Sequence, residues 1–447
     1  MFITNTRDSF VTVLSFLLIT ILLLILICTS RLHSLINLTD TSYTSNAISG
    51  NLYTADSLSN PKMALRANLK SFVQPKIIEL EEDSDLMALH NKSDQNDYPD
   101  FKVYSDAFDC TRNLKVDEIN FTLVTQLSDD RMWMMQEHCA RWKAPMSVLI
   151  FSNKAKDDIV QQLIDFGCPV SRDNLESEEF ILKIIQADKY SVDDYPVNTM
   201  RNIAIRDVQT THLFYIDVDF WPGVDTYKAL MDGNVRKWLA EDPKLAIIVP
   251  AFQIFRQCHE YRDCREENIK VMPKTVHDVK NLWNRKHQRI FMFDPTNHNG
   301  HGSTDYESWL EMNAGDLKDL ECIKSNRYEP YIAVRHCDEL SPYQEQFTGY
   351  GKNKMSQAMQ MRRSGYLYSQ VGGGFLVHYP HLDSKSRIKW NKVSFDKNGD
   401  INKEQSKRAQ VDKLFIQFKK WLENKVLDSA RTPECEHFKN DDSKLWV

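Results

Sequence analysis

The stretch FYIDVDFWPG, residues 214–223, decides the fold class, because an apolar run stops at two aspartates and then closes on Pro222 and Gly223. In a strand, alternate residues point to the same face, so Asp217 and Asp219 are expected to point together while Val218 points into the core. Ligands of open α/β sheets bind at the carboxyl ends of the strands. The stretch therefore predicts a buried strand that ends in a ligand site.

Strand and helix patterns alternate on both sides of this stretch. Apolar runs predict strands over residues 119–127, 146–152, 179–186, 211–219 and 245–252. Helical periodicity lies between them, over residues 129–142, 155–167, 195–209 and 227–239. Such alternation predicts an α/β fold, a doubly wound sheet with helices on both faces. The pattern becomes irregular from 251 to about 370, where substrate loops are expected, and residues 403–426 predict an amphipathic helix packed on the body.

The N-terminal region has the composition of a membrane anchor. Residues 10–28 form an uncharged apolar run of membrane length, and the alternative is a cleaved signal peptide. The run divides the chain into a cytoplasmic tail (1–9), a transmembrane signal anchor (10–28), a polar stem (29–100) and a catalytic domain (101–447). We expect a single-pass membrane protein.

Cysteines and glycosylation sequons favour a lumenal domain. Sequons occur at Asn37, Asn91 and Asn120, and eight of the nine cysteines lie outside the apolar run. An even number allows up to four disulfides in an oxidising compartment; buried free thiols are the alternative. Cys258 and Cys264 are close enough to close a small loop.

The charge pattern argues against nucleic acid as a partner. The formal net charge is −6, and no basic tract of the kind that follows a phosphate backbone is present in the sequence.

The paired aspartates point to a different ligand. Two like charges this close repel each other, and oxygen ligands select Mg²⁺ or Mn²⁺, which bind phosphate oxygens. The alternative is a chance Asp-x-Asp on a solvated loop.

Four blocks in the same order resemble glycosyltransferase family 49, the family of LARGE-type C-terminal domains and a beta-1,4-glucuronyltransferase. The blocks are TLVTQLSDDRMWMMQEHCARWKAPMSVLIF (122–151), YPVNTMRNIAIRDV (195–208) with FYIDVDFWPG, EPYIAVRHCDELSPYQEQFTGYGKNKMSQ (329–357) and GGGFLVHYP (372–380). The resemblance runs over about residues 118–425.

The resemblance implies a GT-A fold, which is a Rossmann-like nucleotide-sugar-binding sheet. It also implies an inverting transfer from a UDP-sugar, with UDP-glucuronate expected, to a glycan or glycoprotein acceptor. Mn²⁺ (or Mg²⁺) is the implied cofactor, and a type II Golgi membrane protein with a lumenal catalytic domain is the implied topology. A homodimer is left open.

The same resemblance assigns roles to individual residues. Asp217 and Asp219 match the Asp-x-Asp motif, with Asp219 the more direct metal ligand, and His378 matches a third metal ligand. Without the family, His378 reads as a core histidine after an apolar strand.

Donor contacts are implied for a helix face and a loop lysine. Asn198, Arg201 and Asn202 share one helix face and match residues that contact the nucleotide or its pyrophosphate. Arg201 could instead only pair with an aspartate. Lys354 follows a Gly-Tyr-Gly turn and could pair with donor charge, or it could be a solvated lysine.

Glu345 is the expected general base, because an inverting transfer needs a carboxylate that removes the acceptor proton. The family usually has Asp and Arg where this chain has Gln344 and Gln346. If the base belonged at position 344, this chain would lack it. Two alternatives follow: a catalytically silent glycan-binding relative, or the same fold with another donor, such as UDP-xylose or UDP-N-acetylglucosamine.

Overall fold

The computed structural model describes residues 99, 101–102, 109–171, 177–189, 195–258, 264–283, 288–294, 298–391 and 406–436. The expected tail, anchor and stem (1–100) fall outside this set except for Pro99, and so do the sequons at Asn37 and Asn91. Among the described residues, no helix combines the length and the apolarity needed to cross a membrane. The anchor at residues 10–28 therefore stays a prediction.

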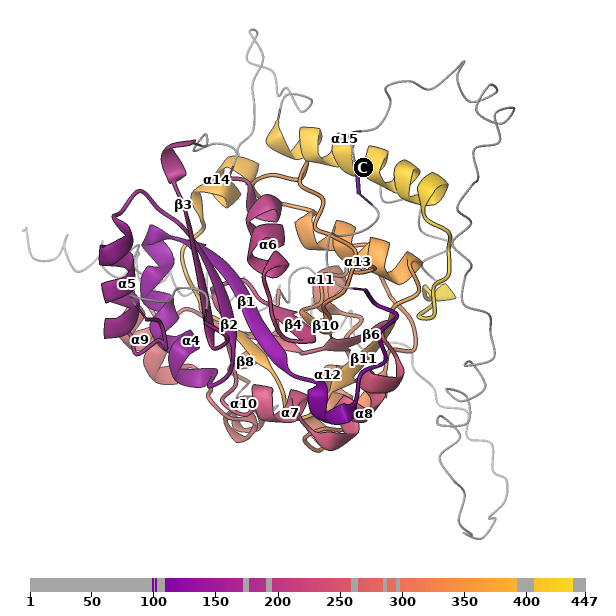
Figure 1. Ribbon diagram of the computed structural model, residues 1–447, viewed down its shortest axis with the longest axis horizontal. Coiled ribbons are helices and arrows are strands. Elements are labelled where there is room, and N and C mark those ends of the chain that lie inside the picture. Colours follow the sequence, from indigo (N-terminus) through magenta and orange to yellow (C-terminus); the bar gives the residue numbers. More distant parts are fainter. Residues whose placement is uncertain are drawn as a thin grey trace, which may run out of the picture. The chain divides into compact units, whose positions relative to one another are not determined.

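A mixed eight-stranded sheet lies at the centre of the described residues, in the order β3-β2-β1-β4-β10-β6-β11-β9 (Figure 1). The strand bounds are β1 Phe121–Ser128, β2 Met146–Phe151, β3 Phe180–Ile185, β4 His212–Tyr215, β6 Leu245–Ile248, β9 Leu317–Asp319, β10 Ile332–Arg335 and β11 Leu367–Val371.

The sheet is not parallel throughout, which corrects the simplest doubly wound prediction. Strands β3, β2, β1 and β4 are parallel, with Phe121 of β1 opposite His212 of β4. Strand β10 then enters antiparallel to both β4 and β6, with Ala333 opposite Phe214. Strand β10 lies more than a hundred residues after its partner β4 in the sequence, so local periodicity does not reveal where β10 inserts in the sheet.

The helices follow the predicted alternation, with two elements divided. The α-helix bounds are α4 Met135–Arg141, α5 Lys156–Asp165, α6 Val197–Arg206, α7 Thr226–Leu230, α8 Gly233–Glu241, α9 Arg265–Val271, α10 Val276–Leu282, α11 His298–His301, α12 Tyr306–Glu311, α13 Asn353–Arg363, α14 Lys385–Asn391 and α15 Lys407–Lys425. Short 3-10 helices span Val116–Glu118, Asp129–Met134 and Ala187–Lys189. The predicted helix 227–239 breaks where Asp232 caps α8, and the predicted strand 245–252 breaks at Pro250, which has no N–H to donate.

Helices bury both faces of the sheet, as the alternating pattern predicts. Leu123 and Phe214 belong to one core, which they share with α4 and α5. Val124 and Leu213, the neighbouring positions, belong to a second core with α6 and α13. Figure 1 shows α6 beside β1. The α/β class with helices on both faces is confirmed.

A second, four-stranded sheet brings two distant segments to the site. It is formed by β5 Phe220–Pro222, β12 Leu376–His378, β7 Ala251–Ile254 and β8 Ile290–Met292, in that order. Strand β12 runs antiparallel to β5, with His378 opposite Phe220. Because Phe220 directly follows Asp219, this pairing places His378 beside Asp219. Tyr379 N also donates to Asp219 O at 2.7 Å.

Four disulfides join all eight cysteines of the expected lumenal region. The pairs are Cys110–Cys337, Cys139–Cys168, Cys258–Cys264 and Cys322–Cys435. The predicted pair at 258 and 264 is confirmed, and the alternative of buried free thiols is excluded for these residues. Disulfides persist in oxidising compartments, so the pairing agrees with a lumenal domain.

The C-terminal helix α15 packs on the body through an aromatic core, as predicted. Its buried Phe418 and Trp421 lie 5.4 Å and 5.3 Å, ring to ring, from Phe101. Phe347 belongs to the same cluster. The helix therefore supports the segment 343–347, which contains the expected general base.

Candidate functional site

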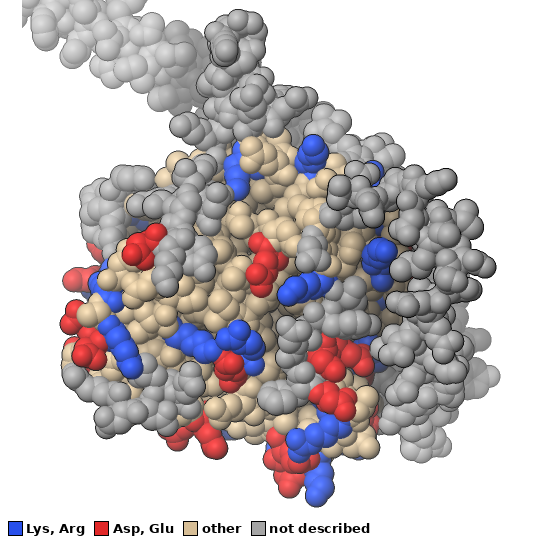
Figure 2. Space-filling view, turned by 45° about the horizontal axis from the view of Figure 1, so that its top comes forward, with Lys and Arg blue, Asp and Glu red and all other residues tan. Residues whose placement is uncertain are grey.

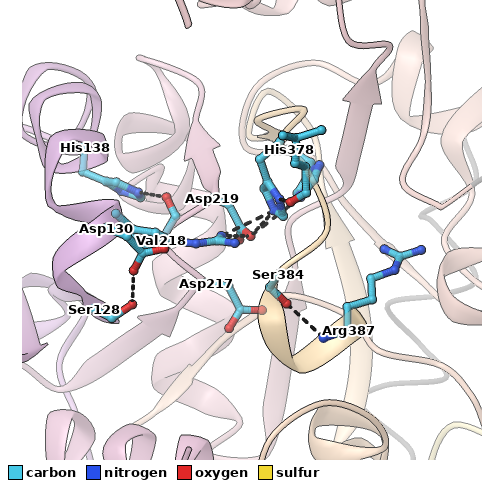
Figure 3. Close-up of polar contacts among 12 residues, drawn as sticks. Ser128, Asp130, His138, Asp217, Val218, Asp219, His378, Ser384 and Arg387 are labelled. Carbon is cyan, nitrogen blue, oxygen red and sulfur yellow. Dashed lines mark hydrogen bonds and ion pairs between the residues drawn. The ribbon is translucent and has the colours of Figure 1, made fainter. Parts of the chain in front are cut away.

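The paired aspartates lie in the turn between β4 and β5 rather than on a strand. Strand β4 ends at Tyr215, and Phe220 N donates to Asp217 O at 2.9 Å to close the turn. Val218 is buried, as the alternation predicts, but Asp217 and Asp219 meet different neighbours (Figure 3). The motif therefore lies at the carboxyl end of β4, as predicted, while the turn gives its two carboxylates separate environments.

Asp217 has a fully occupied carboxylate. Its Oδ1 accepts hydrogen bonds from Arg201 Nη2 at 2.8 Å and from Tyr215 OH at 3.1 Å. Its Oδ2 accepts from Tyr331 OH at 2.8 Å and from Lys354 Nζ at 2.9 Å. A carboxylate offers about four lone-pair positions, so these four donors use all of them. In this arrangement Asp217 has no free lone pair for a metal ion.

Two cations hold Asp217 in its charged form. Burial by itself would raise the pKa of Asp217, but Lys354 and Arg201 together bring that pKa well below its usual value. Both are ion pairs, and the Arg201 side chain is only 4% exposed. The three groups together carry one net positive charge next to the metal-ligand candidates.

Asp219 faces two histidines. The Nε2 atom of His381 lies 2.9 Å from Asp219 Oδ2, and that of His378 lies 3.7 Å from the same oxygen. One ligand atom from each residue lies within 4.8 Å of the others. A carboxylate oxygen with two imidazole nitrogens is a donor set that suits Mn²⁺ and related divalent ions. The residues present therefore fit a divalent metal, with His381 in addition to the predicted Asp219 and His378.

His381 lies between a backbone carbonyl and the Asp219 carboxylate. Its Nδ1 lies 2.6 Å from Leu382 O, and a carbonyl oxygen only accepts, so Nδ1 carries a proton. The Nε2 atom of the same ring lies 2.9 Å from Asp219 Oδ2. Arg131 Nη1 meets both groups, because it donates to Asp219 Oδ2 at 2.6 Å and lies 3.4 Å from His381 Nε2.

The ionisation states agree with metal binding. Burial would raise the pKa of Asp219, but Arg131 and the two histidines bring that pKa well below its usual value. Burial lowers the pKa of His378, which keeps this imidazole in the neutral form that binds metals. The carboxylate is thus charged and His378 uncharged at neutral pH.

His138 holds the residue between the two aspartates. It is fully buried on α4, and its Nε2 donates to Val218 O at 2.7 Å (Figure 3). Burial lowers the pKa of His138 to about 4, so the ring is neutral at physiological pH. The next residue, Cys139, ties α4 to Cys168. His138 is therefore a positioning residue for the turn.

The predicted donor-binding face of α6 contacts the chain itself. Residues 198, 201 and 202 do lie close together, but Arg201 pairs with Asp217, which was the simpler alternative. Asn198 Nδ2 donates to Gln344 O at 2.7 Å, and Asn202 Nδ2 donates to Tyr343 O at 2.8 Å. The two asparagines thus fix the segment that carries the expected base.

Glu345 is exposed and bonded to α6. Its carboxylate accepts hydrogen bonds from Thr199 Oγ1 at 3.0 Å and from Asn202 Nδ2 at 2.9 Å. The neighbouring Gln344 is buried, and its Nε2 donates to Lys102 O at 2.6 Å and to Gln360 Oε1 at 2.7 Å. A side chain at position 344 therefore points into the body, so replacing a carboxylate there by Gln does not remove a solvent-facing base.

A second carboxylate, Glu329, lies near the paired aspartates and was not singled out from the sequence. Glu329 Oε2 lies 3.9 Å from Lys354 Nζ, and Lys354 bonds Asp217. Burial raises the pKa of Glu329 above its usual value. Glu329 opens the block EPYIAV, so its position in a resembling block was the available signal.

Glycines shape the approach of two site residues. Gly351 has a φ of 101°, and a Cβ there would lie 2.5 Å from the Trp390 ring, so the turn that leads into Lys354 needs glycine. A Cβ on Gly372 would overlap Asn313 O. The glycines before His378 therefore allow close backbone packing, as predicted.

Besides Glu329, sequence reasoning did not single out Arg131, His138 or His381. The repeated histidine in HYPH was a signal for His381, because His378 ends a strand and His381 follows three residues later. Arg131 and His138 lie in the resembling block 122–151, which was the available signal, but their partners lie about 80 residues away in the sequence. On the face shown in Figure 2, acidic and basic side chains are interspersed.

Comparison with known proteins adds a family. Residues 168–414, more than half of the chain, match the family described as glycosyl-transferase for dystroglycan. The xylosyl- and glucuronyltransferase LARGE2s of Danio rerio is 28% identical over 276 residues, which are 60% of this chain and 32% of the relative. The glycosyltransferase-like protein gnt14 of Dictyostelium discoideum is 28% identical over 309 residues, 66% of this chain and 43% of the relative. The chain thus spans about a third to two fifths of the length of these relatives.

Similar solved structures are more distant. The crystal structure of GalNAc-T7 with UDP, GalNAc and Mn²⁺ has 10% sequence identity and a TM-score of 0.33, and the similarity covers 60% of this chain and 44% of that one. The crystal structure of S. aureus TarS 1–349 in complex with UDP-GlcNAc has 9% identity and a TM-score of 0.29, over 62% of each chain.

Proposed function

The chain belongs to the family of glycosyl-transferases for dystroglycan, and from this premise we propose that it transfers a sugar from a UDP-sugar to a hydroxyl group of a glycan acceptor. Inversion at the anomeric carbon, a GT-A fold and glucuronate as the sugar are parts of the proposal. The observation that carries it is the cluster formed by Asp219, on the turn after β4, with His378 and His381, at and just beyond the end of β12.

The residues of the cluster would hold Mn²⁺ or Mg²⁺. When bound, such an ion supplies positive charge that stabilises the departing diphosphate. The chain contributes two further cations, Arg201 and Lys354, which pair with Asp217, and Lys354 also lies 3.9 Å from Glu329 Oε2. His138 keeps the turn in place through Val218 O. Together these groups favour an anionic leaving group at this edge of the sheet.

The general base is a carboxylate that takes the acceptor proton. Glu345 is the prediction from sequence, and Glu329 is the second carboxylate near the paired aspartates. Glu345→Gln and Glu329→Gln should be compared by kcat with the same donor. The variant that removes the base is expected to lose about 10²- to 10⁴-fold in kcat, while the other stays within about tenfold of the wild type. Equal, small losses in both would mean that neither residue is the base.

The proposed location is the Golgi membrane, with the anchor at residues 10–28 and a lumenal catalytic domain. Four disulfides support an oxidising compartment. Protease protection of a C-terminally tagged full chain in sealed microsomes tests this topology. Digestion of the tag without detergent would contradict it.

A donor panel tests the activity itself. The lumenal domain is incubated with UDP-glucuronate, UDP-xylose and UDP-N-acetylglucosamine, with Mn²⁺ or with chelator, and UDP release is measured. We expect Mn²⁺-dependent release from UDP-glucuronate. Release only from UDP-xylose or UDP-N-acetylglucosamine would overturn the choice of donor, and the relatives are named for both xylosyl and glucuronyl transfer. No release from any donor, together with glycan binding, would instead support the silent relative.

A further inference from the structure

Arg131 is the cation that contacts the candidate metal cluster. Its Nη1 lies 2.6 Å from Asp219 Oδ2 and 3.4 Å from His381 Nε2, which are two of the three groups of the candidate metal cluster. The pair is largely shielded from solvent, with exposures of 19% for Arg131 and 15% for Asp219. Arg131 is therefore a partner of the cluster and not a surface cation that happens to lie nearby.

The charges show that Arg131 and a divalent ion compete for the same carboxylate. Asp219 brings one negative charge, and Arg131 balances it. A divalent ion on the same carboxylate oxygen and the two imidazoles would leave two positive centres around a single carboxylate. In a shielded site, like charges at contact distance repel strongly, since the effective dielectric constant is low. Arg131 must then leave Asp219 Oδ2.

We propose that Arg131 is the resident counter-cation of Asp219, that it exchanges with the divalent ion, and that its released guanidinium then binds the diphosphate of the donor. The inference rests on the proposed function, because it takes the ligand to be a nucleoside diphosphate. A planar guanidinium matches phosphate oxygens in pairs, which an ammonium group does not. The short 3-10 helix Asp129–Met134 carries Arg131 directly before α4, so the side chain can turn without moving the sheet.

Exchange of this kind links the two ligands. While Arg131 is paired with Asp219, metal binding must break this ion pair, which lowers the affinity for the ion. Once a diphosphate is bound, the displaced guanidinium has a new partner. Mn²⁺ and UDP should therefore each strengthen the binding of the other, and the coupling is reciprocal by thermodynamic necessity. Removing Arg131 should make Mn²⁺ bind more tightly alone and UDP bind more weakly with Mn²⁺ present.

The test measures binding and not turnover. Free Mn²⁺ is followed by electron paramagnetic resonance as it is titrated into the purified full chain without nucleotide, and UDP is titrated by calorimetry at saturating Mn²⁺. We expect Arg131→Gln to bind Mn²⁺ at least about fivefold more tightly than the wild type and UDP at least about fivefold more weakly, the lower limit of typical coupling. Mn²⁺ affinity that is unchanged or weaker, or UDP affinity that is unchanged, would overturn the proposal.

Two further variants keep the result interpretable. Arg131→Lys retains the charge but not the planar fork, so its Mn²⁺ affinity should resemble that of the wild type while UDP binding weakens; tighter Mn²⁺ binding in this variant would contradict the exchange. Arg265→Gln removes a cation that stacks 3.9 Å above the Trp133 ring, and it should change neither affinity. If the wild type binds neither Mn²⁺ nor UDP, the proposed function fails; if it binds both and only the Arg131 variants disagree, the exchange alone fails.

Discussion

Asp217 and Asp219 differ in their surroundings although one residue separates them. Asp217 accepts four hydrogen bonds and balances two cations, Arg201 and Lys354. Asp219 faces two histidines and a single cation, Arg131, that a metal ion can replace. The two carboxylates of one Asp-x-Asp motif can therefore have different roles. One carboxylate holds a buried cationic network together, and the other is left for exchangeable ligands.

The largest expected effect is on turnover in Asp219→Asn. The variant loses the charged oxygen of the metal cluster, so UDP release should fall by about 10²- to 10³-fold, as when a group that stabilises transition-state charge is removed. UDP release with Mn²⁺ and the preferred donor measures this. If the variant kept more than a tenth of wild-type activity, Asp219 would not be the carboxylate that binds the metal, and the proposed difference between Asp217 and Asp219 would be wrong. Asp242→Asn, at the surface pair with Arg431, is the control.

Asp217→Asn should affect folding more than Asp219→Asn does. It leaves Arg201 buried and without its charge partner, and breaking a buried ion pair costs about 3–5 kcal/mol of stability. Arg131 can turn toward solvent when Asp219 is replaced, so that variant should lose less than half as much. Urea unfolding followed by tryptophan fluorescence compares them. Equal losses would remove the distinction between the two carboxylates.

The free energy of unfolding should decrease as the pH is lowered, because His138 is buried in its neutral form. Its pKa is about 4 in the folded chain and 6.5 as the reference value, so the unfolded chain takes up a proton first as the pH drops. Above pH 6.5 both states are neutral and nothing is lost; the loss grows below that pH and is complete at about pH 4, where it reaches about 3 kcal/mol. Melting temperatures between pH 7.5 and 4.5 should show a steeper fall for the wild type than for His138→Gln.

The smallest effect is expected from His138→Phe at neutral pH. The ring keeps its volume but loses the hydrogen bond to Val218 O, which lies between the two aspartates. Supporting residues of this kind typically change metal affinity by about 10- to 100-fold. Mn²⁺ titration measures it, and His138→Gln, which keeps a donor, should recover part of the loss. Without such recovery, His138 would be a packing residue only.

Parts of the fold and site were predictable because they depend on local patterns. The apolar run around Phe214 predicted a buried strand, and the alternation of strands and helices predicted helices on both faces of the sheet. The even number of cysteines outside the apolar N-terminal run allowed four disulfides. The resemblance singled out Asp219 and His378, which lie together. The antiparallel insertion of β10 was not predictable, because strand pairing over long separations leaves no local period.

The sequence by itself determined the element types, the position of the aspartates at the end of a strand, and the membrane-length run at residues 10–28, since each follows from neighbours within a few residues. Only the tertiary structure decided which carboxylate faces which cation. The physical reason is that Arg131, Arg201 and Lys354 reach the turn from three separate elements. Their charges act over a few ångströms in space, whatever their separation along the chain.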